Sequence, residues 1–108
     1  MARANLGELE EQILLVLLRL DAESNAVDVA EHLAELTGRD VSAATTFMVM
    51  RRLETRGLLT SRVGDPEPEL GGRPRRFYKI RVKAALPLLR ASRQARLVLW
   101  DGLEDRLR

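Results

Sequence analysis

The spacing of hydrophobic residues predicts an amphipathic helix at the start of the chain. Leucines and one isoleucine recur at three- and four-residue steps from Leu6 to Leu18, which is the helical period. Asn5 is the expected cap of this helix, and Glu8 stands where a capping-box carboxylate would lie. The apolar residues cover more than one stripe, so we expect the helix to contact a second surface besides its own core.

Two further helices are predicted, each bounded by a capping residue. Ser24 or Asn25 is expected to cap the second helix, which runs to about residue 37 and ends before Gly38. Ser42 is expected to cap the third, from Ala43 to about Arg56. The side chains predicted to face inward are Val27, Ala30, Leu33, Ala34 and Leu36 in the second helix and Phe47, Met50 and Leu53 in the third.

After the third helix the hydrophobic period changes from helical to extended. Leu58–Val63 is a predicted strand, Gly64–Pro74 a loop rich in proline and glycine, and Arg75–Ile80 a returning strand. The helical period returns from about Lys83 to the end. The predicted fold is therefore mainly α with a small β-hairpin: a winged helix-turn-helix over residues 1–80, followed by a C-terminal dimerisation helix over residues 81–108.

The last predicted helix has two apolar sides, more than one subunit can cover. Pairing with the first helix and with the same helix of a twofold-related copy would bury both sides. The side chains expected at this interface, or at a ligand site within it, are Leu9, Ile13, Leu89, Leu97, Trp100 and Leu103.

Charge is distributed unevenly along the chain. The formal net charge is only +2, but residues 1–36 hold eight acidic and two basic residues, whereas residues 37–108 hold sixteen basic and eight acidic ones. Such asymmetry indicates that one part of the molecule contacts a polyanion. The longest aliphatic run, Ile13–Leu18, is too short to span a membrane, and there is no cysteine. We therefore expect a cytoplasmic protein without membrane contact or disulfides.

Two segments are suited to double-stranded DNA. The Gly38–Val41 turn would set the third helix at an angle that lets its amino end enter a major groove. Gly71 and Gly72 precede three arginines that would bind phosphate, Arg73, Arg75 and Arg76. The acidic half of the loop, residues 65–69, would face away from the DNA. The third-helix residues expected to reach bases or phosphates are Ser42, Ala43, Thr45, Thr46, Val49, Arg51 and Arg52.

Several short motifs resemble the PadR family of transcriptional regulators, over residues 6–103. They are Leu6-Gly7-Glu8-Leu9-Glu10, Leu36-Thr37-Gly38-Arg39-Asp40-Val41-Ser42, Arg52-Leu53-Glu54-Thr55-Arg56-Gly57-Leu58 and Gly71–Arg76 followed by Phe77-Tyr78. The short tail is similar to the subgroup with a single C-terminal helix. The resemblance implies a homodimer, a pseudo-palindromic operator, repression and, in some members, release by a small-molecule effector that stacks on a tryptophan such as Trp100. An interface anchor is the simpler role for Trp100.

Other classes of function fit the sequence less well. A winged-helix module that binds protein would not need arginines on the third helix and the loop, and a small-molecule sensor would depend chiefly on Trp100. His32 and Asp28 lie one helical turn apart, but two ligands do not make a zinc site. We expect no catalytic residue, no metal and no cofactor.

Overall fold

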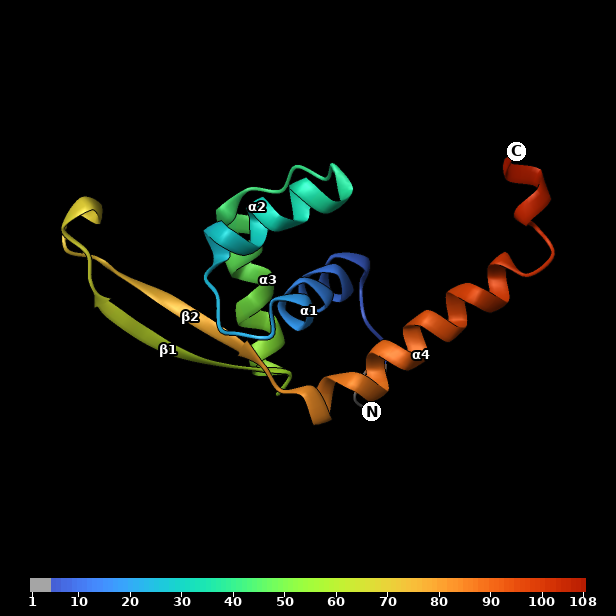
Figure 1. Ribbon diagram of the computed structural model, residues 1–108. Helices are drawn as coiled ribbons and strands as arrows, with labels where there is room; N and C mark the ends of the chain where they lie inside the picture. The colour runs from blue at the N-terminus through green and yellow to red at the C-terminus, as the bar shows by residue number, and fades with distance from the viewer. Residues whose placement is uncertain (1–4) are drawn as a thin grey trace.

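A computed structural model describes residues 5–108, apart from the side chain of Leu70. The elements are α1 (Glu8–Leu20), α2 (Ala26–Thr37), α3 (Ala43–Thr55), β1 (Leu59–Pro66), η1 (Pro68–Leu70), β2 (Pro74–Ile80), α4 (Val82–Trp100) and η2 (Glu104–Leu107). The first three helices form the central body, the β1–β2 hairpin projects on one side, and the end of α4 projects on the other (Figure 1). The expected fold class, a mainly helical winged helix-turn-helix with a further C-terminal helix, is confirmed.

One apolar core joins the three body helices to the base of the hairpin. Its members come from every element except the two 3₁₀ turns, and the largest fully buried side chain is Tyr78 of β2. The ring of Tyr78 packs edge-on against Phe47 of α3, with 6.3 Å between the ring centroids. Ile13 and Leu89 also belong to this core. The prediction that Ile13 and Leu89 line a dimer interface is therefore wrong, because their own subunit buries them.

The helix ends follow local capping chemistry. Asn25 accepts a hydrogen bond from the backbone N–H of Asp28 at 3.0 Å, and Gly38 ends α2 with a φ of 74°, as expected. The start of α1 differs from the prediction: Gly7 is the N-cap, and its N–H donates to Oε1 of Glu10 at 2.8 Å. The carboxylate that completes this cap therefore belongs to Glu10 and not to Glu8.

The inward face of α2 also differs from the prediction. Val27 and Leu36 are exposed, whereas Val29 and Leu33 are buried. The buried pair is four residues apart, on one stripe of α2. The predicted face therefore included two exposed residues and omitted the buried Val29.

The hairpin is longer and its loop shorter than the sequence indicated. β1 continues to Pro66, with a register irregularity between Val63 and Pro66, so Gly64 belongs to the strand and not to the loop. A Cβ at Gly64 would lie 2.6 Å from Cε2 of Phe77, so only glycine allows this close approach. Backbone hydrogen bonds of 2.9 and 2.7 Å between Ser24 and Tyr78 fix the hairpin to the segment before α2.

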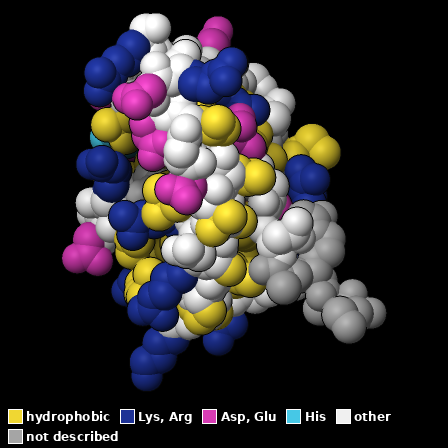
Figure 2. Space-filling model, turned by 90° about the vertical axis from the view of Figure 1, so that its right-hand side faces the viewer, with side chains coloured by type: hydrophobic (Ala, Val, Ile, Leu, Met, Phe, Trp, Pro, Cys, Tyr) yellow, Lys and Arg dark blue, Asp and Glu magenta, His cyan; other side chains and the backbone are white. Residues whose placement is uncertain are grey.

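α4 leaves the body soon after it begins. Only Ala85 and Leu89 of this helix are buried, and every residue from Arg93 to Trp100 is exposed. Figure 2 shows hydrophobic side chains interspersed with charged ones on the face toward which the end of α4 projects. The helix ends at Trp100, two residues before Gly102 with its φ of 79°, and does not continue to the C-terminus as predicted.

None of the helices formed by residues 5–108 has both the length and the apolar character needed to cross a membrane.

Candidate nucleic-acid interface

The amino end of α3 presents two exposed hydroxyl groups. Oγ of Ser42 accepts a hydrogen bond from the backbone N–H of Thr45 at 3.0 Å and lies 3.0 Å from the Thr45 hydroxyl. Both side chains are exposed at the positive end of the helix dipole, where anions are favoured, and Ala43 between them is half-buried. The predicted placement of Ser42 and Thr45 at an accessible helix tip agrees with this geometry.

Two residues expected to reach bases face the core instead. The side chain of Thr46 is 0% exposed, and its hydroxyl donates to the backbone carbonyl of Ser42 at 2.9 Å. Val49 is also buried. Thr46 and Val49 share a helix face with Met50 and Leu53, which the core covers, so their predicted contacts with bases are wrong.

The exposed face of α3 is polar and basic around one apolar residue. Arg51 and Arg52 lie there as predicted, and Met48, 66% exposed, stands among them. Met48, Arg51, Arg52 and Thr55 line a shallow hollow of about 370 Å³. Sequence reasoning missed Ala44, Met48 and Thr55. Met50 and Leu53 were expected to face inward. In a helix with 3.6 residues per turn, Ala44, Met48 and Thr55 lie on the opposite side and could have been predicted from that spacing.

The three arginines of the wing, which is the β1–β2 hairpin with its connecting turn, differ in how far they are already engaged. Arg73 is exposed in the turn between η1 and β2. Arg75 is half-buried, with Nε 3.3 Å from Oε2 of Glu67. The guanidinium of Arg76 donates to Oγ of Ser61 at 3.0 Å. The acidic and basic arms of the wing therefore meet through Glu67 and Arg75.

A second ion pair connects the wing to the body. The guanidinium of Arg62 on β1 bonds the carboxylate of Glu23, which lies between α1 and α2. These hydrogen bonds lower the pKa of Glu23, and the carboxylate in turn raises the pKa of Arg62. Arg62 also lies 5.0 Å from the centroid of the Phe77 ring. This pair could not be predicted from the sequence, because its partners are 39 residues apart in the chain.

The acidic N-terminal third pairs with arginines outside the predicted DNA-contacting set. Glu8 binds Arg39 of the turn before α3 at 2.7 Å, and Glu10 binds Arg56 at 3.1 Å. Glu23 binds Arg62, as described above. The described ion pairs of this acidic region thus involve other arginines than those of the exposed α3 face.

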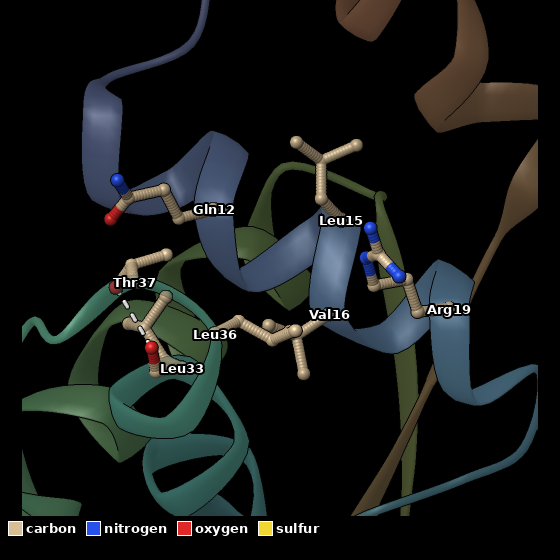
Figure 3. Close-up of a pocket in the computed structure, with 7 residues that line it drawn as sticks. All are labelled: Gln12, Leu15, Val16, Arg19, Leu33, Leu36 and Thr37. Atoms are coloured by element: carbon tan, nitrogen blue, oxygen red, sulfur yellow. Dashed lines mark hydrogen bonds between the residues drawn. The ribbon is translucent and has the colours of Figure 1, made fainter.

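A separate apolar surface lies on α1 and α2. A groove of about 220 Å³ lies between these helices, and its apolar lining is Leu15, Val16, Leu33 and Leu36. Figure 3 shows these side chains beside the polar Gln12, Arg19 and Thr37. Leu15 and Leu36 are exposed. This is a second apolar face of α1, as the width of its hydrophobic pattern indicated.

The residues expected at a dimer or ligand site fall into two groups. Leu97, Trp100 and Leu103 are exposed on or just after the projecting part of α4, and Leu9 is half-buried on α1. Ile13 and Leu89 are buried, as stated above. Within residues 5–108, no three His, Asp or Glu side chains lie close enough together to hold a metal ion.

Comparison with known proteins identifies similar solved structures. No protein-family model matches the chain, and no curated protein matches it. A PadR family transcriptional regulator from Eggerthella lenta DSM 2243 is 32% identical, with 88% of this chain and 80% of that chain covered and a TM-score of 0.67.

Two other solved structures share the fold at lower identity. A transcriptional regulator from Clostridium thermocellum is 16% identical, covers 92% of each chain and gives a TM-score of 0.69. A PadR family transcription regulator from Clostridium difficile R20291 is 14% identical, with 94% of this chain and 95% of that one covered and a TM-score of 0.59. On the identity and coverage of the Eggerthella lenta relative, this chain belongs to the PadR family of transcriptional regulators.

Proposed function

We propose that the protein is a repressor that binds a pseudo-palindromic DNA operator as a homodimer in the cytoplasm. Residues 1–80 would form the DNA-binding unit and residues 81–108 the dimerisation unit. The observation that carries the proposal is the exposed face of α3, where Arg51 and Arg52 follow the hydroxyl-bearing helix tip of Ser42 and Thr45. A helix of this composition suits a major groove, because hydroxyls and guanidiniums bind both phosphates and base edges.

The wing would supply the second contact with DNA. Arg73 and Arg76 are exposed and suited to phosphate or to a narrow minor groove. Because each subunit of a dimer would contribute one α3 and one wing, the affinity should fall steeply with salt. Neutralisation of about six to ten phosphates predicts a log–log slope of about −5 to −9.

The dimer would form through α4. Its last turns carry Leu97, Val98, Leu99 and Trp100 in exposed positions, and a second copy could cover them. We place the partner's α4 against two surfaces of this subunit. One is the exposed apolar side of α1, marked by Leu15, and the other is the exposed part of α4.

Selection of bound duplexes from a random pool at physiological salt tests this function. The expected product is a twofold-symmetric sequence whose half-sites lie about one or two helical turns apart. A reporter carrying the selected sequence upstream of its start site should then be less active when the protein is present. Failure to enrich any sequence above the input pool would contradict the proposal, and enrichment of single half-sites would contradict its dimeric part.

A response to a small-molecule effector is a second candidate, favoured by the exposed indole of Trp100. Planar aromatic cations should quench Trp100 fluorescence and release the selected duplex if this site binds effectors. Quenching without release would indicate a ligand site uncoupled from DNA, and no quenching would remove the candidate. The exposed arginines of α3 argue against a module that binds only protein.

A further inference from the structure

Met48 lies at the centre of the exposed face of α3. At 3.6 residues per turn, Ala44, Thr45, Arg51, Arg52 and Thr55 all lie within about 60° of it around the helix axis. Core contacts occupy the opposite side, where Thr46, Met50 and Leu53 are buried. Whatever surface this helix contacts, Met48 would reach it first.

The two arginines flank Met48 on opposite sides. The guanidinium of Arg51 lies 6.0 Å from the centroid of the Phe47 ring, and Phe47 packs against Tyr78 of the hairpin. Arg52 lines a hollow together with Glu8 and Glu10 at the amino end of α1. One cation therefore lies toward Phe47 and the hairpin and the other toward α1, so each can bind phosphate on its own side of Met48.

The thioether of Met48 restricts what the residue can recognise. It carries no hydrogen-bond donor and only a weak acceptor, so it cannot read the polar edges of the bases. The apolar group that base edges present in the major groove is the C5-methyl of thymine. A long, flexible and polarisable side chain fits such a methyl group without a fixed geometry.

We propose that Met48 is a specificity-determining residue that contacts the C5-methyl group of a thymine in each operator half-site. This inference rests on the proposed function, since it assumes that α3 enters a major groove. It predicts a preference for thymine that does not depend on hydrogen bonding.

Replacement of single thymines by deoxyuridine in the selected duplex tests the contact, because it removes the methyl group and leaves the base pairing unchanged. Wild-type protein should lose about fourfold in affinity for each contacted methyl removed, at one thymine in each half-site. Met48→Leu, which stays apolar, should keep this preference. Met48→Gln, of matched length but polar, should bind the thymine and uracil duplexes equally.

The possible results distinguish a failure of the Met48 contact from a failure of the proposed function. If wild-type protein binds the selected duplex but tolerates uracil at every position, or if Met48→Gln keeps the full thymine preference, the role of Met48 is overturned while the function stands. If no duplex is selected at all, both fail. Because Met48 is exposed, all three proteins should have the same urea midpoint, which excludes misfolding as the cause of a difference.

Discussion

The carboxylate of Glu11 on α1 accepts hydrogen bonds from the guanidinium of Arg96 on α4. The side chain of Glu11 is only 5% exposed, and Ser92 of α4 donates a further hydrogen bond to it at 3.0 Å. The Arg96 hydrogen bonds lower the pKa of Glu11, although burial acts to raise it. Glu11 is therefore ionised, and this ion pair fixes the projecting helix to the body of the subunit.

The lowered pKa of Glu11 predicts acid lability. A carboxyl whose pKa is lower in the folded state than in the unfolded state stabilises the fold at neutral pH, and this stabilisation is lost as the pH falls through the folded-state pKa. The loss should begin near the ordinary value of 4.5 and continue below it. Urea unfolding at a series of pH values should show a smaller acid-induced decrease for Glu11→Gln than for the wild type. Parallel curves would show that Glu11 does not contribute.

Removal of Arg96 should destabilise the protein at neutral pH. Arg96→Met leaves the Glu11 carboxylate buried with Ser92 as a remaining partner, and we expect a loss of about 1–3 kcal/mol in the free energy of unfolding. The matched control is Arg93→Met, since Arg93 is exposed on the same helix and should change stability by less than about 0.5 kcal/mol. Chemical denaturation measures both variants. Equal effects would assign the loss to helix charge and not to the Glu11 contact.

The parts of this fold that depend on neighbouring residues could be predicted from the sequence. The caps at Asn25 and Ser42 and the left-handed Gly38 are local, because a side chain three residues away or a positive φ decides them. The burial of Thr46 could not be predicted in this way. A threonine near a helix start has the same local chemistry whether it faces solvent or core, and only the packing of α3 against the other helices decides which.

The same limit applies to the charges of the candidate site. Three arginines close together in the loop correctly indicated a basic wing, but the partner of Arg75 depends on where β1 ends. β1 continues through Gly64 to Pro66, which pairs with Pro74, and the next residue, Glu67, lies within 3.3 Å of Arg75. Ion pairs over long sequence distances, such as Arg62 with Glu23, left no signal in the sequence.

Release of Arg75 from Glu67 should strengthen DNA binding. Glu67→Gln removes both a negative charge from the wing and the carboxylate that holds the Arg75 guanidinium. Glu69→Gln removes an equal charge from an exposed position and is the matched control. We expect Glu67→Gln to increase affinity for unrelated duplexes by about 2- to 5-fold more than the control does, measured by fluorescence anisotropy at fixed salt. If the two variants match, Arg75 takes no part in binding.

The hydroxyl of Tyr78 is buried, and nothing within residues 5–108 forms a hydrogen bond with it. Burial raises the pKa of Tyr78. Tyr78→Phe keeps the ring against Phe47 and removes an unsatisfied polar atom, so the free energy of unfolding should stay equal or rise by about 1 kcal/mol. Tyr78→Ala should lose about 3–5 kcal/mol through the cavity it leaves. A clear loss of stability in Tyr78→Phe would show that the hydroxyl has a partner in solution.

A charge on the exposed part of α4 should prevent dimerisation. Leu97→Glu would place a carboxylate in the apolar surface that a second copy is proposed to cover, and we expect a monomer in sedimentation equilibrium at concentrations where the wild type is dimeric. Val63→Glu, at a similarly exposed apolar position on the hairpin, should remain dimeric. A monomeric wild type, or a dimeric Leu97→Glu, would contradict the proposed interface.

The exposure of α4 from Arg93 to Trp100 on all sides has a consequence for the backbone itself. A stretch of this length has too few turns to be stably helical in water, where isolated helices shorter than about 12–15 residues are marginal. Among the described residues its ion pair to the body is the one between Arg96 and Glu11, so in a lone subunit the backbone amides beyond Arg96 should exchange with deuterated solvent early. Slow exchange there would be a direct signature that another molecule lies along this segment, and its dependence on protein concentration would tell a second copy from a foreign one.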